Sequence, residues 1–440
     1  MPRSAKLLTY VAAALSPCLA TLTSAAAPPD SDSFAAVAAV TITDRGGVTA
    51  KPLTSFDISF VDPTISIYAL GDRTNNAVDL VDTQSNTFLH FCGHGQFRGF
   101  TGNNDTSGPD GVLIRDHIEI WAGDGDSTVK VFNLATCTEQ SGPDHTIPTG
   151  DPINDKRADE MCYDPADNLI MVANNAADPP FASLISTSSY SVVKKITFDG
   201  TNGAPKSTNG IEQCQWSPRT GKFYITVPGV DSPNTGHGVV AVINPNSMRV
   251  ERTFDIPLAN CDTPQGMAIG PDRQILVGCN GSGSTTHSSV IIDERNGHIM
   301  ATVANESGPD EVWFNPGNGH YFLARSAAFG GTQKLGIIDA VSMVADTDIS
   351  VAPAGKNAHS VAADSVTNKT FFPIPGSSGS TLCSSVGGSD TSGCILVVKG
   401  TNDQDDCVAE GAPVTQASAG EDAVFLKASC SDHDQHSGNN

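Results

Sequence analysis

Short apolar stretches alternate along most of the chain with polar turns rich in Gly, Asn, Asp and Pro. The apolar stretches consist mainly of Val, Ile, Leu and Ala, and no segment keeps a sustained helical period. Short β-branched stretches separated by turn residues are typical of antiparallel strands. The pattern therefore predicts an all-β fold.

Seven segments share one arrangement: a polar residue, a short apolar strand, a turn with Pro or Gly, and a second apolar strand. They begin at Asp57, Asp110, Asp159, Glu212, Gln265, Asp310 and His359, with spacings of 53, 49, 53, 53, 45 and 49 residues. A repeat of this length suits one four-stranded blade. We therefore expect a seven-bladed β-propeller.

A closed propeller needs an outer strand for its last blade. The apolar, β-branched stretch 36–43 precedes the first repeat, and we expect it to pair beside 395–398 in the seventh blade. This pairing would cover an otherwise exposed sheet edge. The expected organisation is a signal peptide at 1–27, a flexible leader at 28–35, the propeller at 36–400 and a polar, partly disordered extension at 401–440.

The amino terminus has the features of a secretory signal. Arg3 and Lys6 precede an apolar run over 7–15 that is too short to span a bilayer, and small residues follow at 25–27. We therefore expect a secreted protein, or one in the lumen of the secretory pathway. The formal net charge of −23 would repel nucleic-acid phosphates and anionic lipid, so neither nucleic acid nor a membrane is an expected partner.

Ten of the eleven cysteines lie beyond the signal segment, and this even number favours disulfides in an oxidising compartment. Cys383 with Cys394 would staple one loop, and Cys407 with Cys430 would pin the tail. The other six cannot be paired from the sequence. Four Asn-x-Ser/Thr sequons are candidates for glycosylation, at Asn104, Asn280, Asn305 and Asn368.

The first polar residue of each repeat should lie at one mouth of the central channel, where the inner strands begin. Carboxylates crowded there must bind a cation, hold protons at raised pKa or stay hydrated. The candidate metal ligands are Asp57, Asp110, Asp159, Glu212 and Asp310, and Ca²⁺ suits such an oxygen-rich set. The alternative is a water-filled channel without a metal, and acid–base catalysis is the third reading.

Loops on the same face could form a pocket for a small apolar molecule. The candidate binding residues are Phe97, Arg98, Phe100, Phe181, His237 and Phe329, an apolar wall with a few polar groups. The alternative is that these Phe side chains pack the loops onto the blades. The candidate catalytic residues are His359, Arg325, Asp110 and Glu212.

The repeat over 36–400 resembles that of the YVTN/YncE-like seven-bladed propellers. Asp110-Gly111 in Pro-Asp-Gly-Val is similar to a metal-site strand of the regucalcin/gluconolactonase propellers, although that family has six blades and its Glu-Gly-Pro-x-Trp partner is missing here. The leader, blades, cysteines and sequons together resemble the secreted propeller hetero-Diels–Alderases of fungal tropolone–sesquiterpenoid pathways. This last resemblance implies coupling of a quinone-methide-like tropolone or phenol to an olefinic terpene such as humulene.

Three functions remain open from the sequence. The first is a cofactor-free enzyme for a small apolar substrate, with a hetero-Diels–Alder reaction as its chemistry. This reading agrees with a sequence without GxSxG, HExxH, Walker or GxGxxG motifs. The second is a divalent-metal lactonase or hydrolase that uses the acidic ring. The third is a secreted binding protein without catalysis.

Overall fold

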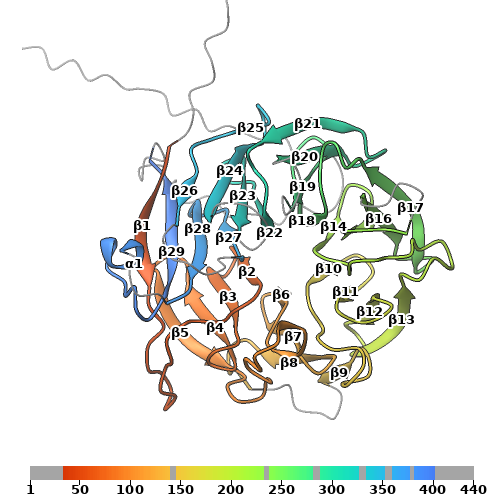
Figure 1. Cartoon of the computed structure of the whole chain (residues 1–440). Helices are drawn as coiled ribbons and strands as arrows, with labels where there is room; N and C mark the ends of the chain where they lie inside the picture. The colour runs from red at the N-terminus through yellow and green to blue at the C-terminus, as the bar shows by residue number, and fades with distance from the viewer. Residues whose placement is uncertain are drawn as a thin grey trace, which may run out of the picture. The chain divides into compact units, whose positions relative to one another are not determined.

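Strands dominate the computed structural model, and they form seven sheets arranged in a ring around a central channel (Figure 1). The structure describes residues 33–138, 145–231, 237–280, 288–326, 333–351, 359–376 and 381–401, which belong to one compact unit. Each sheet is antiparallel, and its strands follow the chain from the channel outward in six of the seven blades. The predicted seven-bladed all-β propeller is confirmed.

The first four blades each contain four consecutive strands. Blade 1 consists of β2 (Ser59–Asp62), β3 (Ile67–Asp72), β4 (Ala77–Asp82) and β5 (Thr87–Cys92). Blade 2 consists of β6 (Val112–Arg115), β7 (Glu119–Asp124), β8 (Thr128–Asn133) and β9 (Thr146–Pro148), preceded by the 3₁₀ turn η1 (Asn104–Thr106). Blade 3 consists of β10 (Met161–Asp164), β11 (Leu169–Asn174), β12 (Phe181–Ser186) and β13 (Ser191–Thr197). Blade 4 consists of β14 (Cys214–Ser217), β15 (Lys222–Val227), β16 (Gly238–Asn244) and β17 (Arg249–Ile256).

Blade 5 keeps this plan, whereas blades 6 and 7 depart from it. Blade 5 consists of β18 (Pro264–Ile269), β19 (Gln274–Cys279), β20 (Ser288–Asp293) and β21 (Ile299–Ala304). Blade 6 consists of β22 (Pro309–Asn315), β23 (His320–Arg325), β24 (Lys334–Asp339), β25 (Val344–Ala345) and β26 (Ile349–Ser350), of which the last two both pair with β24. Blade 7 consists of β27 (Ala362–Asp364), β28 (Lys369–Ile374), β29 (Cys394–Gly400) and β1 (Phe34–Val40), with the short helix α1 (Leu382–Ser385) between β28 and β29.

Ring closure occurs in blade 7, where β1 pairs antiparallel with β29. The register joins Phe34 to Gly400 and Val40 to Ile395, so the expected closing strand is confirmed. The strand begins at Phe34, two residues before the expected start of the propeller at position 36. Ala36 and Ala39 pack against the cluster that includes Phe372 and Leu396, so burial of small apolar side chains holds the two ends of the fold together.

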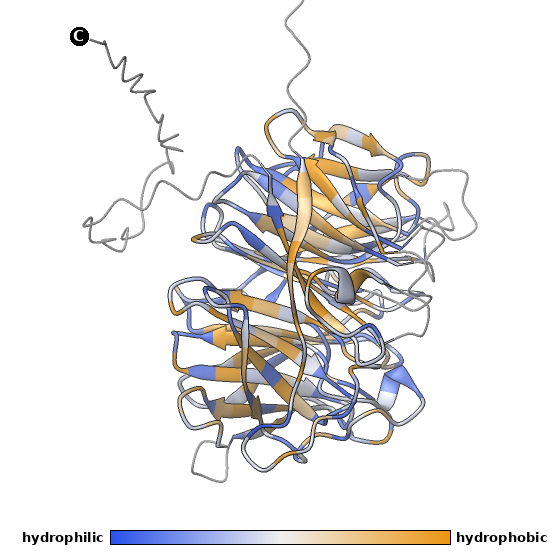
Figure 2. Ribbon diagram, turned by 90° about the vertical axis from the view of Figure 1, so that its left-hand side faces the viewer, coloured by the Kyte–Doolittle hydropathy of each residue, from blue (hydrophilic) through white to orange (hydrophobic). Residues whose placement is uncertain are grey.

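The core consists of clusters between neighbouring blades, because the side chains of each sheet point alternately toward the two adjacent blades. Figure 2 shows the apolar residues concentrated in the strands and the hydrophilic ones in many of the turns. No helix in the described ranges has the length and apolar character needed to cross a membrane.

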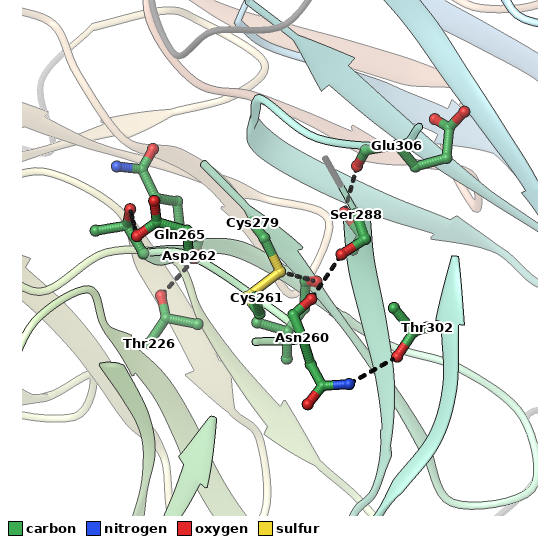
Figure 3. The surroundings of a disulfide bond; sticks show 12 residues. Thr226, Asn260, Cys261, Asp262, Gln265, Cys279, Ser288, Thr302 and Glu306 are labelled. Carbon is green, nitrogen blue, oxygen red and sulfur yellow. Dashed lines mark hydrogen bonds between the residues drawn. A yellow bond between two sulfur atoms is a disulfide. The ribbon is translucent and has the colours of Figure 1, made fainter. Parts of the chain in front are cut away.

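In the part of the chain that the structure describes, four disulfides fasten the blades, which indicates an oxidising environment. The expected Cys383–Cys394 bond is confirmed, and the proposed Cys407–Cys430 pair lies outside the described residues. Cys261–Cys279 fixes the loop before β18 to the end of β19 (Figure 3). Ser288 Oγ, at the start of β20, also donates to Asn260 O in this loop at 2.6 Å. The bonds Cys92–Cys137 and Cys162–Cys214 each join neighbouring blades.

Removing Cys162–Cys214 by the double substitution to alanine is expected to lower the free energy of unfolding by about 2–4 kcal/mol. The bond links the inner strands of blades 3 and 4 across a sequence separation of 52 residues, so its loss frees a long loop in the unfolded chain. The measurement is chemical denaturation of both proteins. The matched control replaces Cys383 and Cys394, which are separated by only 11 residues, and should lose less; a larger loss in the control would contradict the argument.

Candidate functional site

The acidic ring forms at the start of the inner strands, as the repeat predicts. Ligand atoms of Asp57, Asp110 and Asp159 all lie within 4.8 Å of one another, and all three residues are buried. Glu212 and Asp310 are half-buried, and the charge of Asp310 helps to raise the pKa of both Glu212 and Asp159. Three of the four catalytic candidates, Asp110, Glu212 and His359, therefore lie at or beside the ring.

Two arginines that the sequence analysis did not single out hold this ring together. Arg73 follows β3, is almost fully buried, and forms ion pairs with both Asp57 and Asp110. Arg157 pairs with Asp159 at 2.7 Å and lies 3.6 Å from Asp57. The Nε2 atom of His359 lies 3.4 Å from Asp57 Oδ1 and 2.9 Å from the carbonyl oxygen of Phe56.

These contacts give the acids different protonation behaviour. Burial alone would raise the pKa of Asp57, but Arg73, Arg157 and His359 outweigh it and lower that pKa. Burial raises the pKa of Asp110 well above its usual value and raises the pKa of Asp159 to about 7. The ring is thus an ion-pair cluster in which the guanidinium groups supply the positive charge that a bound cation would otherwise provide.

A cavity of about 390 Å³ occupies the central channel, on the side of the ring toward the turns between first and second strands. Its wall is formed by the inner strands of six blades, and its lining is mainly apolar. Half-buried aromatic side chains surround it at Phe60, Tyr163, Trp216, Trp313 and Phe314. Phe60 and Trp313 meet edge to face at 5.5 Å between ring centroids, which fixes part of this aromatic wall.

Several polar side chains line the cavity, and three of them come from the second position of a repeat: Glu160, Gln213 and Glu311. Gln213 Oε1 accepts from the N–H groups of Met267 at 2.7 Å and Val312 at 3.1 Å. Glu311 Oε2 accepts from Ser360 Oγ at 2.7 Å and Val361 N at 2.9 Å. Gln213 thereby ties blade 4 to the inner strands of blades 5 and 6, and Glu311 ties blade 6 to blade 7.

Glu160 differs from Gln213 and Glu311. Its side chain is 5% exposed and makes no hydrogen bond among the residues that the structure describes. Burial, and then the charges of Asp159, Glu212 and Glu311, raise the pKa of Glu160 well above its usual value. The raised pKa favours the neutral form of this carboxyl group, which can donate a hydrogen bond into an apolar space.

The residues expected to form a pocket on the loop face lie apart from this cavity. Phe97 is buried within a blade interface against Phe132, at 5.6 Å between ring centroids. Phe181 is buried in β12, and Lys195 Nζ lies 3.6 Å from its ring centroid. Their positions favour the alternative role in packing.

The other candidates of that set are scattered. Phe100 and Arg98 are exposed, His237 is half-buried at the start of the strand β16, and Phe329 lies outside the described residues. Arg325 is buried in blade 6, where it bonds to Asp348 at 2.7 Å and to Ser307 O at 2.9 Å. It is thus committed to a pair within its own blade and does not line the cavity.

The four sequons differ in exposure. Asn104 and Asn305 are exposed, Asn368 is half-buried, and Asn280 is 9% exposed. Only the first two therefore present their side chains freely to solvent for modification in the folded protein.

Comparison with known proteins supports the fold and gives no further property. No protein-family model matches the chain, and no curated protein matches it. Among solved structures it is similar to hydrazine synthase of Kuenenia stuttgartiensis, with a TM-score of 0.55, 13% identity, and coverage of 75% of this chain and 95% of that one. A similarity at this identity supports the propeller architecture and carries no function with it.

Proposed function

We propose that this protein is a secreted, cofactor-free enzyme that binds a small, largely apolar molecule in the central channel. The observation that carries the proposal is the cavity of about 390 Å³ with its aromatic wall and a few polar groups. Small-molecule sites commonly have roughly 300–1,000 Å³, mainly apolar walls and a few convergent polar groups. The channel replaces the loop face as the proposed substrate site.

The proposed reaction is an intermolecular hetero-Diels–Alder cycloaddition between a quinone-methide-like tropolone or phenol and an olefinic terpene. Two σ bonds form as the oxygen-containing diene adds to the olefin, and no atom leaves. Such a reaction needs orientation and polarisation of the diene and requires neither nucleophile nor leaving group. The resemblance of the sequence to the fungal hetero-Diels–Alderases and the apolar lining of the cavity support this choice.

A divalent-metal lactonase is the second candidate, because Asp57, Asp110 and Asp159 bring three oxygens within 4.8 Å of one another. Ca²⁺ would have to displace Arg73 and Arg157 from these oxygens or coordinate beside them. The two guanidinium groups therefore argue for the apolar-cavity enzyme. A binding protein that uses the same cavity without turnover is the third candidate.

Ligand-dependent stability tests the cavity. A sesquiterpene or phenolic ligand at about 100 Kd should raise the free energy of unfolding by about 2.7 kcal/mol. EDTA and Ca²⁺ should leave it unchanged. Met161→Trp, which places a larger side chain in the lining, should abolish the ligand effect, whereas the matched control Met300→Trp on the outer strand β21 should retain it.

The alternatives predict other results. A loss of stability in EDTA that Ca²⁺ restores, without any response to the apolar ligands, would favour the lactonase. Incubation of a quinone-methide precursor with humulene should yield an adduct whose mass is the sum of both reactants, faster with the native protein than with Met161→Trp. Ligand binding without faster adduct formation would favour the binding protein.

A further inference from the structure

The third residue of each repeat presents its backbone to the channel. In blade 2, Asp110 N donates to Gly123 O and Gly123 N donates to Gly111 O, after which Val112 pairs with Ala122. Antiparallel ladders alternate hydrogen-bonded and non-hydrogen-bonded pairs, so the N–H of Val112 points away from β7 and toward the channel.

The same bonding pattern recurs in blades 3 and 4. Asp159 N and Glu212 N donate to the second strands of their blades, and the carbonyl groups of Glu160 and Gln213 accept from those strands. Met161 and Cys214 follow as the next residues in register. Their N–H groups therefore also face the channel, and Val112, Met161 and Cys214 all line the cavity.

In three of the other four blades, a side-chain oxygen accepts a hydrogen bond from the equivalent N–H group. Gln213 Oε1 accepts from Met267 and Val312, and Glu311 Oε2 accepts from Val361. The repeat thus builds a ring of inward amide donors, three of which bind side-chain oxygen atoms of this chain. Within the described residues, no side chain bonds to the N–H groups of Val112, Met161 and Cys214.

We propose that two channel-facing N–H groups of neighbouring blades, Val112 with Met161 or Met161 with Cys214, bind the carbonyl oxygen of a neutral, otherwise apolar substrate, with the carboxyl group of Glu160 as a further donor in the same cavity. The inference rests on the proposed function, because it names the substrate class of the same cavity. The ligand would be a ketone, an enone or a quinone-methide-like molecule. Its oxygen would take the place that the side-chain oxygens of Gln213 and Glu311 take in three of the other blades.

The surroundings select a neutral ligand over an anion. Among the described residues, seven carboxyl groups lie around the channel, and the cationic groups that face them are the guanidinium groups of Arg73 and Arg157 and the imidazole of His359. A ligand carboxylate would meet this excess of acids, whereas a carbonyl oxygen needs only donors. The neutral form of the Glu160 carboxyl group, which its raised pKa favours, supplies such a donor. A hydrogen bond to a conjugated carbonyl draws electron density from the diene that reacts.

The test uses a matched pair of probes, 1-tetralone and the hydrocarbon tetralin. The two have the same carbon skeleton, and a C=O group in the ketone replaces one CH2 group of the hydrocarbon. Calorimetric titration of the full-length secreted protein should show about tenfold tighter binding of the ketone. The C=O stretch of carbon-13-labelled tetralone should shift to lower wavenumber on binding. Glu160→Gln, which keeps a donor, should retain most of both effects, and Glu160→Leu should lose most of them.

Each other outcome has a defined meaning. Equal binding of ketone and hydrocarbon, or an unshifted C=O stretch, overturns the oxygen site while the apolar cavity stands. Tighter binding of 1-naphthoate than of tetralone also overturns it, since the site would then prefer an anion. Failure of both tetralin and tetralone to bind overturns the proposed function itself. Because Glu160→Gln conserves size and polarity, it keeps the comparison valid if the leucine variant fails to fold.

Discussion

Replacing Arg73 by leucine is expected to lower the free energy of unfolding at neutral pH by about 3–5 kcal/mol, because the substitution leaves a buried carboxylate without its main partner. Arg73 is 1% exposed and pairs with Asp57, whose pKa it helps to lower. Asp57 keeps only Arg157 at 3.6 Å and His359 at 3.4 Å after this change. Urea denaturation of native and variant protein measures the loss.

A double-mutant cycle separates the ion pair from the packing of the arginine stem. Combined with Asp57→Asn, the leucine substitution should cost less than the sum of the two single changes, because the unpaired charge is then absent. The control Arg295→Leu removes a surface ion pair with Asp293 and should not change the free energy of unfolding measurably. Additive losses in the cycle would show that the ring does not depend on this pair.

Stability is expected to be higher at pH 5 than at pH 7, by about 2 kcal/mol from Asp159 alone. Burial raises the pKa of Asp159 from 3.8 to about 7, so between these values the folded state keeps a proton that the unfolded state has lost. Folding stability then falls as the pH rises through this window. Glu306, whose pKa burial raises to about 8, adds to the same trend.

Denaturation curves at a series of pH values from 4 to 8 check this dependence. Asp159→Asn and, outside the channel, Glu306→Gln should each reduce the slope. Asp57 has the opposite effect on stability, because folding lowers its pKa. Its contribution to stability is lost only as the pH falls below the unfolded pKa of 3.8. A stability that rises steadily from pH 5 to pH 7 would contradict the burial of protonated acids.

The fold was predictable because each blade has the same local sequence pattern. The polar residue, strand and turn recur seven times, so an error in one blade would not change the architecture, and the positions from Asp57 to His359 define the inner strands. The closing strand was predictable for the same reason: an apolar β-branched segment before the first blade has one open edge to cover. Three of the disulfides were not predictable, because pairing depends on which loops meet in space.

The site was predictable only where it follows the repeat. The acids of the ring share one repeat position, whereas Arg73 and Arg157 occur in single blades and leave no periodic signal. Two clues to these arginines were available: the surplus of acids expected in the ring, and the position of Arg157 two residues before Asp159. The cavity was missed because Met161 and Trp216 have the pattern of ordinary strand residues. Phe97 and Phe181 look the same in sequence whether they pack inside a blade or line a pocket.

The pairing of β1 with β29 has a consequence for how the chain matures. Its two strands are separated by almost the whole sequence, so the ring closes only after β29 has left the ribosome. Until then β1 has no partner strand, and the other blades form an open arc. The unpaired backbone groups at its strand edges can pair with other chains. Contacts of such long range also slow folding. The topology itself therefore sets how long these strand edges stay exposed during synthesis.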